Sequence, residues 1–282
     1  MSDGYQFSPI VCDDSGLAAM STLLLGVFPR ARQLTPAYLR WLYRENPDGE
    51  ALGLNAFHGG RLVGHCAGVP LVATIDGEAR RGIILVNAAV DRDHRRKNIT
   101  RRTTDPMFEQ AAAAGYDFAI STGNRYSTLP LLTRFEMVGR LDARIGVGSP
   151  RRTEPAPAPS FERDWSGAAL RWRLANPEGR YSVRHRAGTL SVIAATGTPG
   201  IGAVLFDGPD RWVPDESGPS PAPLRVWLGL DPAMRWSRSA FLPIPSRLRP
   251  SPLNLLYKAL SGQGYLPDPS RIVFRALDFD PY

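Results

Sequence analysis

The sequence has very little cysteine and no long apolar run. Cys12 and Cys66 are the only cysteines among 282 residues, too few for a disulfide framework or a zinc site. We therefore predict no metal site and a reduced, cytoplasmic setting. No apolar stretch approaches the roughly 20 residues that a membrane-spanning helix needs. Residues 1–5 are not a basic segment leading into an apolar run, so neither a signal peptide nor a membrane partner is expected.

Lysine is also scarce, and arginine carries nearly all the positive charge. Lys97 and Lys258 are the only lysines, although the formal net charge is +7. We interpret the arginine bias partly as genomic composition. A basic chain suits an anionic ligand such as a nucleotide, a phosphate or an acidic sugar, and does not by itself indicate nucleic acid. With 43% hydrophobic residues, the chain is able to build a sizeable core and more than one domain.

One stretch, residues 83–135, combines an apolar strand with a strongly basic loop. Residues 83–90 are apolar apart from one asparagine, and residues 91–100 are polar and basic. A helical run ending at Gly115 and a short strand at 117–120 follow. A strand, an anion-ready loop, a helix and a second strand form the layout of a phosphate-binding crossover. We therefore predict the cofactor site here.

The residues before this stretch predict antiparallel strands and two helices. The long second strand of the hairpin region is expected to bulge near Gly68–Val69–Pro70. The order β-α-α-β-β-β-loop-α-β-α predicts an α/β (α+β) fold with a mixed central sheet. The predicted elements are a strand at 6–12, a helix at 15–27 capped by Asp13 or Asp14, a helix beginning at Thr35-Pro36, and strands at 51–57, 61–75 and 81–90.

The second half contains a partial repeat of the first. Leu-Arg-Trp at 39–41 and Asn-Pro-Asp-Gly at 46–49 recur as Leu-Arg-Trp at 170–172 and Asn-Pro-Glu-Gly at 176–179. A strand, a turn and another strand follow each copy. We interpret this as a duplication in which the second copy has lost the basic loop. Both tryptophans are predicted to be core residues of equivalent helices.

These patterns predict two domains joined by a linker. The first domain covers residues 1–147 and the second covers 164–282. The linker, residues 148–163, is rich in proline and alanine, and a second such run lies at 213–223. At the C-terminal end we predict a helix over 251–260 and a closing strand over 271–279.

The order of elements in residues 1–147 and the basic loop resemble the GNAT superfamily of acyl-CoA-dependent N-acyltransferases. The family loop reads roughly Val-x-Pro-x-Tyr-Arg-Gly-Lys-Gly-Ile-Gly, and residues 90–100 here read Val-Asp-Arg-Asp-His-Arg-Arg-Lys-Asn-Ile-Thr. Arg95 and Ile99 fit the signature Arg/Gln-x-x-Gly-x-Gly/Ala, whereas Asn98 and Thr100 occupy its glycine positions. Phe-Glu-Met-Val-Gly at 135–139 resembles the family's Gly-Phe-x-x-x-Gly ending. The second half resembles the decayed copy of tandem members.

The resemblance implies an acetyl-CoA or other acyl-CoA site in the loop. Backbone N–H groups turning into a helix N-terminus form a nest for pyrophosphate. Asn98 tolerates the left-handed conformation that glycine usually adopts. Thr100 either donates its hydroxyl to a phosphate or crowds the phosphate. The predicted cofactor-binding residues are Ala89, Val90, Arg95, Arg96, Lys97, Asn98, Ile99, Thr100, Arg101 and Asn124.

The acid and base that the family often uses are missing. Asn87 stands near the position of the usual Glu, and Pro130 or Leu131 near that of the usual Tyr. The predicted substitutes are Asp91, His94 and Tyr126; His65, Ser121 and Thr122 are further alternatives. Each has an ordinary interpretation too, since a loop histidine is usually a surface residue and a tyrosine at a helix start usually packs.

The leading hypothesis is an enzyme that moves an acetyl or other acyl group from acyl-CoA to a primary amine. The resemblance implies a small polar acceptor, such as an amino sugar or an amino acid, in a cleft completed by the second domain. The alternative is a non-catalytic module of the same fold that binds an anionic metabolite. Nucleic acid binding is not expected, because no aromatics alternate with the basic residues. We expect a monomer or a homodimer.

Overall fold

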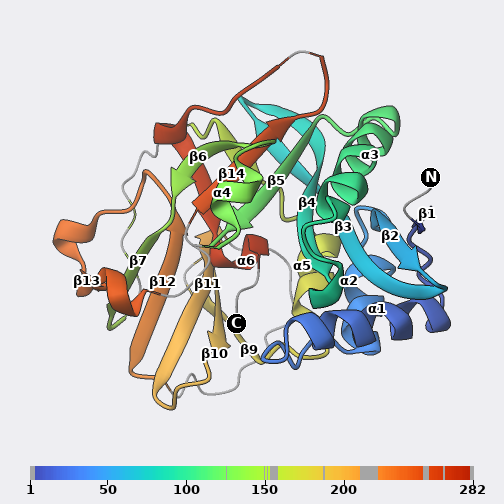
Figure 1. Ribbon diagram of the computed structural model, residues 1–282. Helices are drawn as coiled ribbons and strands as arrows, with labels where there is room; N and C mark the ends of the chain where they lie inside the picture. Colours follow the sequence, from blue (N-terminus) through green and yellow to red (C-terminus); the bar gives the residue numbers. More distant parts are fainter. Residues whose placement is uncertain are drawn as a thin grey trace.

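The computed structural model describes residues 4–124, 126–148, 150, 152, 158–186, 188–209, 222–249, 254–262 and 264–279. Strands dominate this part of the chain (Figure 1). They are, in order, β1 (Tyr5–Pro9), β2 (Leu52–His58), β3 (Arg61–Ile75), β4 (Glu78–Val90), β5 (Phe118–Gly123), β6 (Glu136–Arg140), β7 (Asp142–Gly146), β8 (Phe161–Arg163), β9 (Tyr181–Arg186), β10 (Thr189–Ala195), β11 (Ile201–Pro209), β12 (Leu224–Leu230), β13 (Phe241–Pro243), β14 (Asn254–Ala259) and β15 (Ile272–Arg275).

Two helices of the first half begin where the sequence supplies side-chain caps. Asp13 accepts a hydrogen bond from the Gly16 N–H, and Thr35 accepts one from the Tyr38 N–H, which confirms both predicted helix starts. The helices are α1 (Asp14–Val27), α2 (Pro36–Tyr43), α3 (Ile99–Ala113), α4 (Thr128–Leu131), α5 (Gly167–Leu174) and α6 (Ala276–Phe279), with 3₁₀ turns η1 (Arg92–His94), η2 (Trp236–Arg238), η3 (Ser246–Leu248) and η4 (Pro269–Arg271). None of the described helices has the length and apolar character needed to span a bilayer.

All the strands are linked into one mixed, 15-stranded sheet. Its main path is β6-β14-β5-β4-β3-β8-β15-β12-β11-β10-β9, with β1, β2, β7 and β13 as branches. Most neighbours are antiparallel, but three pairs are parallel: β4 with β5, β8 with β15, and β11 with β12. The α/β class with a mixed central sheet is therefore confirmed.

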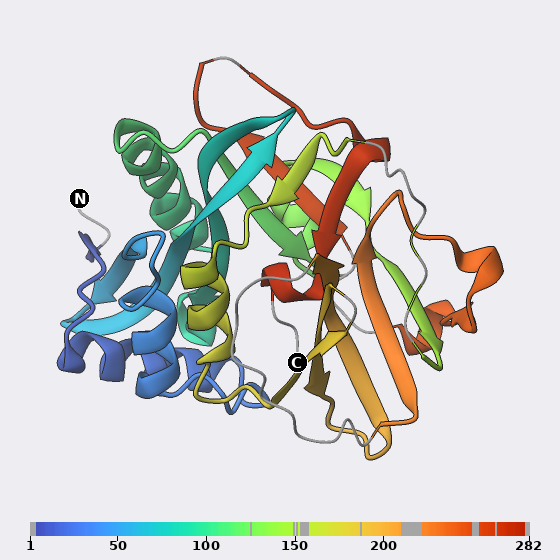
Figure 2. The same cartoon turned by 180° about the vertical axis from the view of Figure 1, so that it is seen from behind.

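The helices α1, α2 and α3 cover opposite faces of the first-half strands. Ile84 and Ile120 belong to a core shared with α1 and α2, while Ile83 and Ala119 pack with residues of α3. This alternation is what period-two strands produce. Figures 1 and 2 show α3 on one side of β3 and β4, and α2 and α5 side by side on the other.

The two halves exchange strands. In the first half, β14 from the C-terminal region pairs with β5 and with β6, and so lies between them. In the second half, β7 pairs with β12 and with β13. Each half thus receives one strand from the other. The helix predicted over 251–260 is wrong, because residues 254–259 form this central strand and residues 251–253 lie outside the described part.

Two further sequence predictions need correction near the ends of the second half. The closing strand predicted over 271–279 ends at Arg275, where the chain turns into α6, and the Asp278 carboxylate accepts the N–H of Arg275 at 2.5 Å. Residues 161–163, predicted as linker, form β8 and pair with β3. The domain boundaries at 147 and 164 stay predictions, although strand pairing crosses them. Most of the second proline-rich run, 213–221, lies outside the described residues.

The second half repeats the order of the first. β8, α5, β9, β10, β11 and β12 follow one another in the order of β1, α2, β2, β3, β4 and β5, and the described residues of the second half contain no counterpart of α1 or α3. The matching helices meet through Trp41 and Trp172, whose rings stack with centroids 4.9 Å apart. Each indole N–H donates to the backbone carbonyl of the other tryptophan, at 2.7 and 2.9 Å. Both side chains are buried, as predicted, at 3% and 7% exposed. The repeated tryptophans therefore form a two-fold-like contact between the halves.

This contact predicts a measurable stability change. Trp172→Phe keeps an aromatic ring in the stack but removes the N–H that satisfies the buried carbonyl of Trp41. We expect a loss of about 1–3 kcal/mol in the free energy of unfolding. Urea unfolding measures it. Trp236→Phe is the matched control, because the Trp236 indole N–H donates to none of the described residues. Equal stability of the two variants would contradict the assigned role.

Candidate functional site

The parallel strands β4 and β5 are hydrogen-bonded only over their first halves. Their register pairs run from Gly82 to Ile84 and from Phe118 to Ile120. Beyond this point β4 stays paired with β3 as far as Val90, and β5 stays paired with β14 as far as Gly123. The facing edges of β4 and β5 therefore keep backbone N–H and C=O groups that no neighbouring strand satisfies, which suits an extended ligand.

A bulge in β4 lies directly beyond the last pair with β5. The register against β3 shifts between His65 and Ala67, so that Asn87 and Ala88 lie opposite Cys66 alone. Asn87 has a left-handed backbone, with φ of 54°. An extra residue in this conformation changes the direction in which the strand's side chains point. The bulge predicted near Gly68–Pro70 is wrong, since the register there is regular.

The basic loop has the backbone of an anion-binding turn. Arg96 and Asn98 have φ values of 61° and 58°, and they stand where the resembled family loop has glycines. The first backbone hydrogen bond of α3 runs from the Arg102 N–H to the Asn98 carbonyl. The N–H groups of residues 99–101 therefore lie before the helical hydrogen-bond ladder and point to an anion site. The left-handed conformation is thus kept without glycine.

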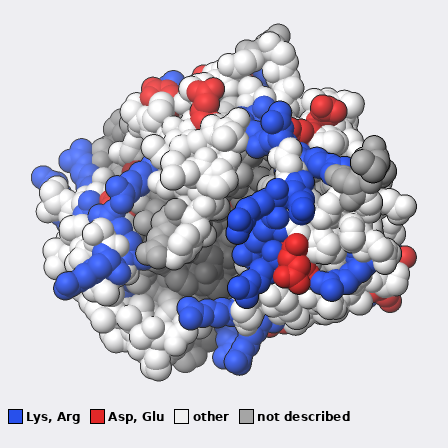
Figure 3. All heavy atoms as spheres, in the orientation of Figure 1, with Lys and Arg blue, Asp and Glu red and all other residues white. Residues whose placement is uncertain are grey.

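A groove of about 590 Å³ joins the bulge to the loop. Ala88, Ala89 and Val90 of β4 line one part of it; the rest is lined by Val27, Phe28, His94, Arg95, Arg96, Asn98, Ile99 and Thr100. A second cavity, of about 940 Å³, shares Val27 and Phe28 with the groove and reaches Asn124 and Tyr126. Lys and Arg side chains gather beside a hollow on this face, over the start of α3 (Figure 3).

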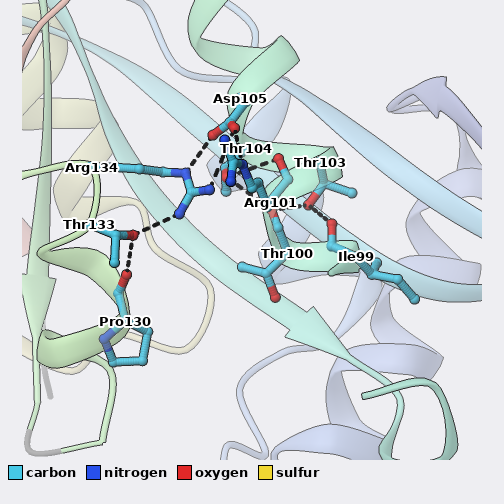
Figure 4. A network of polar contacts seen from close by, with 9 residues as sticks. All are labelled: Ile99, Thr100, Arg101, Thr103, Thr104, Asp105, Pro130, Thr133 and Arg134. Atoms are coloured by element: carbon cyan, nitrogen blue, oxygen red, sulfur yellow. Dashed lines mark hydrogen bonds and ion pairs between the residues drawn. The ribbon is translucent and has the colours of Figure 1, made fainter. Parts of the chain in front are cut away.

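A polar network ties α3 to the segment after β5. Asp105 of α3 accepts hydrogen bonds from Arg101, at 3.0 Å, and from Arg134 (Figure 4). Arg134 also donates to Thr133, whose hydroxyl donates to the carbonyl of Pro130. Hydrogen bonds from Arg134 and Arg101 lower the pKa of Asp105, so the carboxylate stays charged. The network connects the helix beside the groove to α4.

The predicted catalytic residues lie on different sides of the site. His94 lines the groove, and its Nδ1 lies 2.8 Å from the hydroxyl of Tyr5. Asp91 accepts the N–H of Asp93 and pairs with Arg61, and the first of these contacts is the main reason why its pKa is lowered. A carboxylate held in this way is a poor base, and its geometry is that of a cap for η1. Tyr126, 73% exposed, lines the larger cavity.

The predicted cofactor residues are mostly gathered in the groove. Lys97 is exposed on the loop, while Arg101 is paired with Asp105, so its N–H rather than its guanidinium is the group open to an anion. Asn124 has a structural role at the end of β5, where its side-chain oxygen accepts the N–H groups of Tyr126 and Ser127. This matches the Asn that opens the next helix in the resembled family.

Pro106 interrupts the hydrogen-bond pattern inside α3. α3 begins at Ile99, so Pro106 is well inside it and not at its first turn. Proline cannot donate to the carbonyl four residues before it. The hydroxyls of Thr103 and Thr104 donate to the carbonyls of Ile99 and Thr100, so they reinforce the first turn but do not replace the bond that the proline removes.

A chain of hydrogen-bonded polar side chains, most of them buried, lies beneath the bulge, and the sequence predicts only part of it. His65 was a candidate, but its partners were not. The Asn87 amide donates to the Tyr43 hydroxyl at 2.7 Å, this hydroxyl lies 3.0 Å from His65 Nε2, and His65 Nδ1 lies 2.8 Å from Asn55 Oδ1. Burial lowers the pKa of His65 to about 3. The sequence signal for this chain was the presence of polar residues, Asn55 and His65, inside otherwise apolar strands.

No family model matches this chain, and no curated protein does. Solved structures do match. A GCN5-related N-acetyltransferase from Anabaena variabilis has a TM-score of 0.63 at 9% identity, covering 91% of this chain and 73% of that one. Eis1 from Mycobacterium abscessus has a TM-score of 0.59 at 11% identity, covering 91% and 74%. A GCN5-related N-acetyltransferase from Kribbella flavida has a TM-score of 0.57 at 10% identity, covering 91% and 72%. By these matches, the chain has the fold of the GCN5-related N-acetyltransferases.

Proposed function

We propose that this chain is an N-acyltransferase that takes its acyl group from acyl-CoA. The observation that carries the proposal is the parting of β4 and β5 beside a left-handed loop at the start of α3. The unpaired strand edges suit the extended pantetheine arm, and the N–H groups of residues 99–101 suit the pyrophosphate. Arg95, Arg96 and Lys97 supply charge for the phosphates.

The reaction joins the amine nitrogen to the thioester carbon and releases the thiol of CoA. N–H groups on the free edge of β4 polarise the thioester carbonyl in this proposal. Tyr126 remains the proposed acid for the departing thiolate, because it lines the cavity that adjoins the groove. A thiol-release assay with acetyl-CoA and a panel of amines tests the proposal. Absence of both acetyl-CoA binding and thiol release across the panel would overturn it.

We further propose that the acceptor is a neutral or anionic amine, such as an amino acid, and not a polycation. The larger cavity is lined by Val27, Phe28, Pro29, Arg30, Ala31, Gln33, Asn124 and Tyr126. Among the residues that the structure describes, the lining includes no carboxylate, and Arg30 is the one cation. A polycationic acceptor finds no counter-charge among them, whereas a carboxylate gains a partner in Arg30.

The charge of the residues that line the larger cavity predicts a substrate preference. We expect kcat/KM for an apolar amino acid to exceed that for its amide by about 10- to 150-fold, since a charge-assisted hydrogen bond contributes roughly 1.5–3 kcal/mol. Arg30→Ala is expected to remove the difference. Arg247→Ala, in η3, is the matched control. A preference for an aminoglycoside, or an unchanged preference in Arg30→Ala, would contradict this choice of acceptor.

A further inference from the structure

The hydrogen-bond chain under the bulge has a defined direction. Asn55 Oδ1 is only an acceptor, so His65 Nδ1 must carry the proton that joins them. Burial keeps His65 neutral by lowering its pKa to about 3, so its Nε2 is an unprotonated acceptor. The Tyr43 hydroxyl therefore donates to His65 and is left to accept the amide N–H of Asn87. Each donor in the chain therefore has one acceptor.

The direction of the chain fixes the amide of Asn87. Because its nitrogen is bound to Tyr43, its oxygen points away from Tyr43. Asn87 Oδ1 has no hydrogen-bond partner among the described residues and is not buried. Tyr43, Asn55 and His65 are all buried, so the support beneath Asn87 is rigid, whereas Asn87 itself is half-exposed. A side chain whose amide nitrogen is fixed by buried partners and whose oxygen is accessible is suited to binding a ligand.

Asn87 adjoins the groove proposed for the cofactor. It lies in the bulge just beyond the last pair between β4 and β5, and Ala88 and Ala89 next to it line the groove. Its contact with Tyr43 places its side chain on the face covered by α1 and α2. The larger cavity is built by the loop that joins these two helices. Asn87 is not itself a lining residue of either cavity, but it adjoins the groove through Ala88, and its side chain lies on the face of the sheet that carries the loop of the larger cavity.

We propose that Asn87 Oδ1 accepts a hydrogen bond from the acceptor amine and orients its lone pair toward the thioester carbon. Tyr43, His65 and Asn55 are positioning residues that hold the amide in this orientation. The inference rests on the proposed acyl transfer. The amine enters as the free base, its nitrogen bonds to the thioester carbon and the C–S bond breaks. Tyr126 gives its proton to the departing thiolate, and the proton that nitrogen loses restores the Tyr126 hydroxyl. Asn87 binds and orients but takes no proton.

The test is a double-mutant cycle on kcat. Asn87→Ala is expected to lower kcat about 10- to 100-fold, and Tyr43→Phe about tenfold, because a small misplacement of a reacting group has effects of this size. The dissociation constant of acetyl-CoA should stay within about threefold, which a general disruption would not give. Since Tyr43 acts only through Asn87, Tyr43→Phe should add no further loss in the Asn87→Ala background. Tyr265→Phe, which removes a tyrosine hydroxyl bonded to Asp76 outside the site, should leave kcat unchanged.

The outcomes separate this inference from the proposed function. If the wild type transfers no acyl group to any amine, the proposed function falls and this inference with it. If the wild type is active but the two losses simply add, or kcat does not change, only the role of Asn87 is overturned. The ¹⁵N chemical shifts of His65 give a second readout. They should show Nδ1 protonated and Nε2 unprotonated between pH 5 and 8; the opposite tautomer would turn the amide of Asn87 around and overturn the inference.

Discussion

Asp278→Ala should reduce the free energy of unfolding by about 3–5 kcal/mol, the usual effect of removing one member of a buried charged network. The Asp278 carboxylate accepts the Trp165 indole N–H at 2.8 Å and the Arg275 N–H at 2.5 Å. Arg163 donates to the Asp278 carbonyl, and its burial lowers its pKa to about 9. Without the carboxylate, the buried indole N–H of Trp165 and the backbone N–H of Arg275 lose their acceptor, and Arg163 loses an anion that raises its pKa.

The position of Asp278 in the chain explains why the effect should be large. α6 lies centrally between the strands of the two halves in both views (Figures 1 and 2). Asp278 thus lies at the junction where the paired strands β8 and β15 join the two halves. Chemical unfolding by urea measures the change. Asp14→Ala is the control, because Asp14 pairs with Arg40 on the surface and such pairs contribute about 0–1 kcal/mol. A loss for Asp278→Ala no larger than that of the control would contradict this account.

Asn98→Val should weaken acyl-CoA binding about 10- to 100-fold. Asn98 has a left-handed backbone, which a β-branched residue adopts only at a cost of about 1–3 kcal/mol. The loop is expected to relax and to move the N–H groups of residues 99–101 away from the phosphates. Each 1.4 kcal/mol of lost binding free energy is a tenfold change in the dissociation constant. Isothermal titration with acetyl-CoA measures it.

Asn98→Gly separates the backbone from the side chain. Glycine adopts the left-handed conformation freely, so this variant should bind acetyl-CoA as tightly as the wild type or more tightly. Thermal unfolding of both variants checks that the fold is intact. If valine and glycine have the same effect, the loop conformation does not determine the affinity.

The basic loop could be predicted from the sequence because its composition and its turn conformation depend only on nearby residues. Residues 83–100 change from apolar to basic at one point, and asparagine is the residue that best replaces glycine in a left-handed turn. The caps at Asp13 and Thr35 are local for the same reason. These features depend on neighbours within a few residues, so the pattern alone indicated where the groove lies.

Features that depend on distant segments could not be read in this way. Residues 254–259 have helix-forming residues, but pairing with β5 and β6 makes them a strand buried on both faces. Tyr43 belongs to a helix and Asn55 to a strand, and only the fold brings both to His65. The bulge sits at Asn87 because β3 and β4 shift register there, which the glycine and proline of β3 did not indicate.

A crystal structure with bound CoA tests the central claim most directly, because the claim concerns where the cofactor lies. The pyrophosphate should accept hydrogen bonds from the N–H groups of residues 99–101, at about 2.7–3.2 Å. The pantetheine arm should run between β4 and β5 and bring the sulfur close to Asn87 and Ala88. CoA bound elsewhere, or no CoA in the groove at concentrations that saturate the protein, would contradict the account.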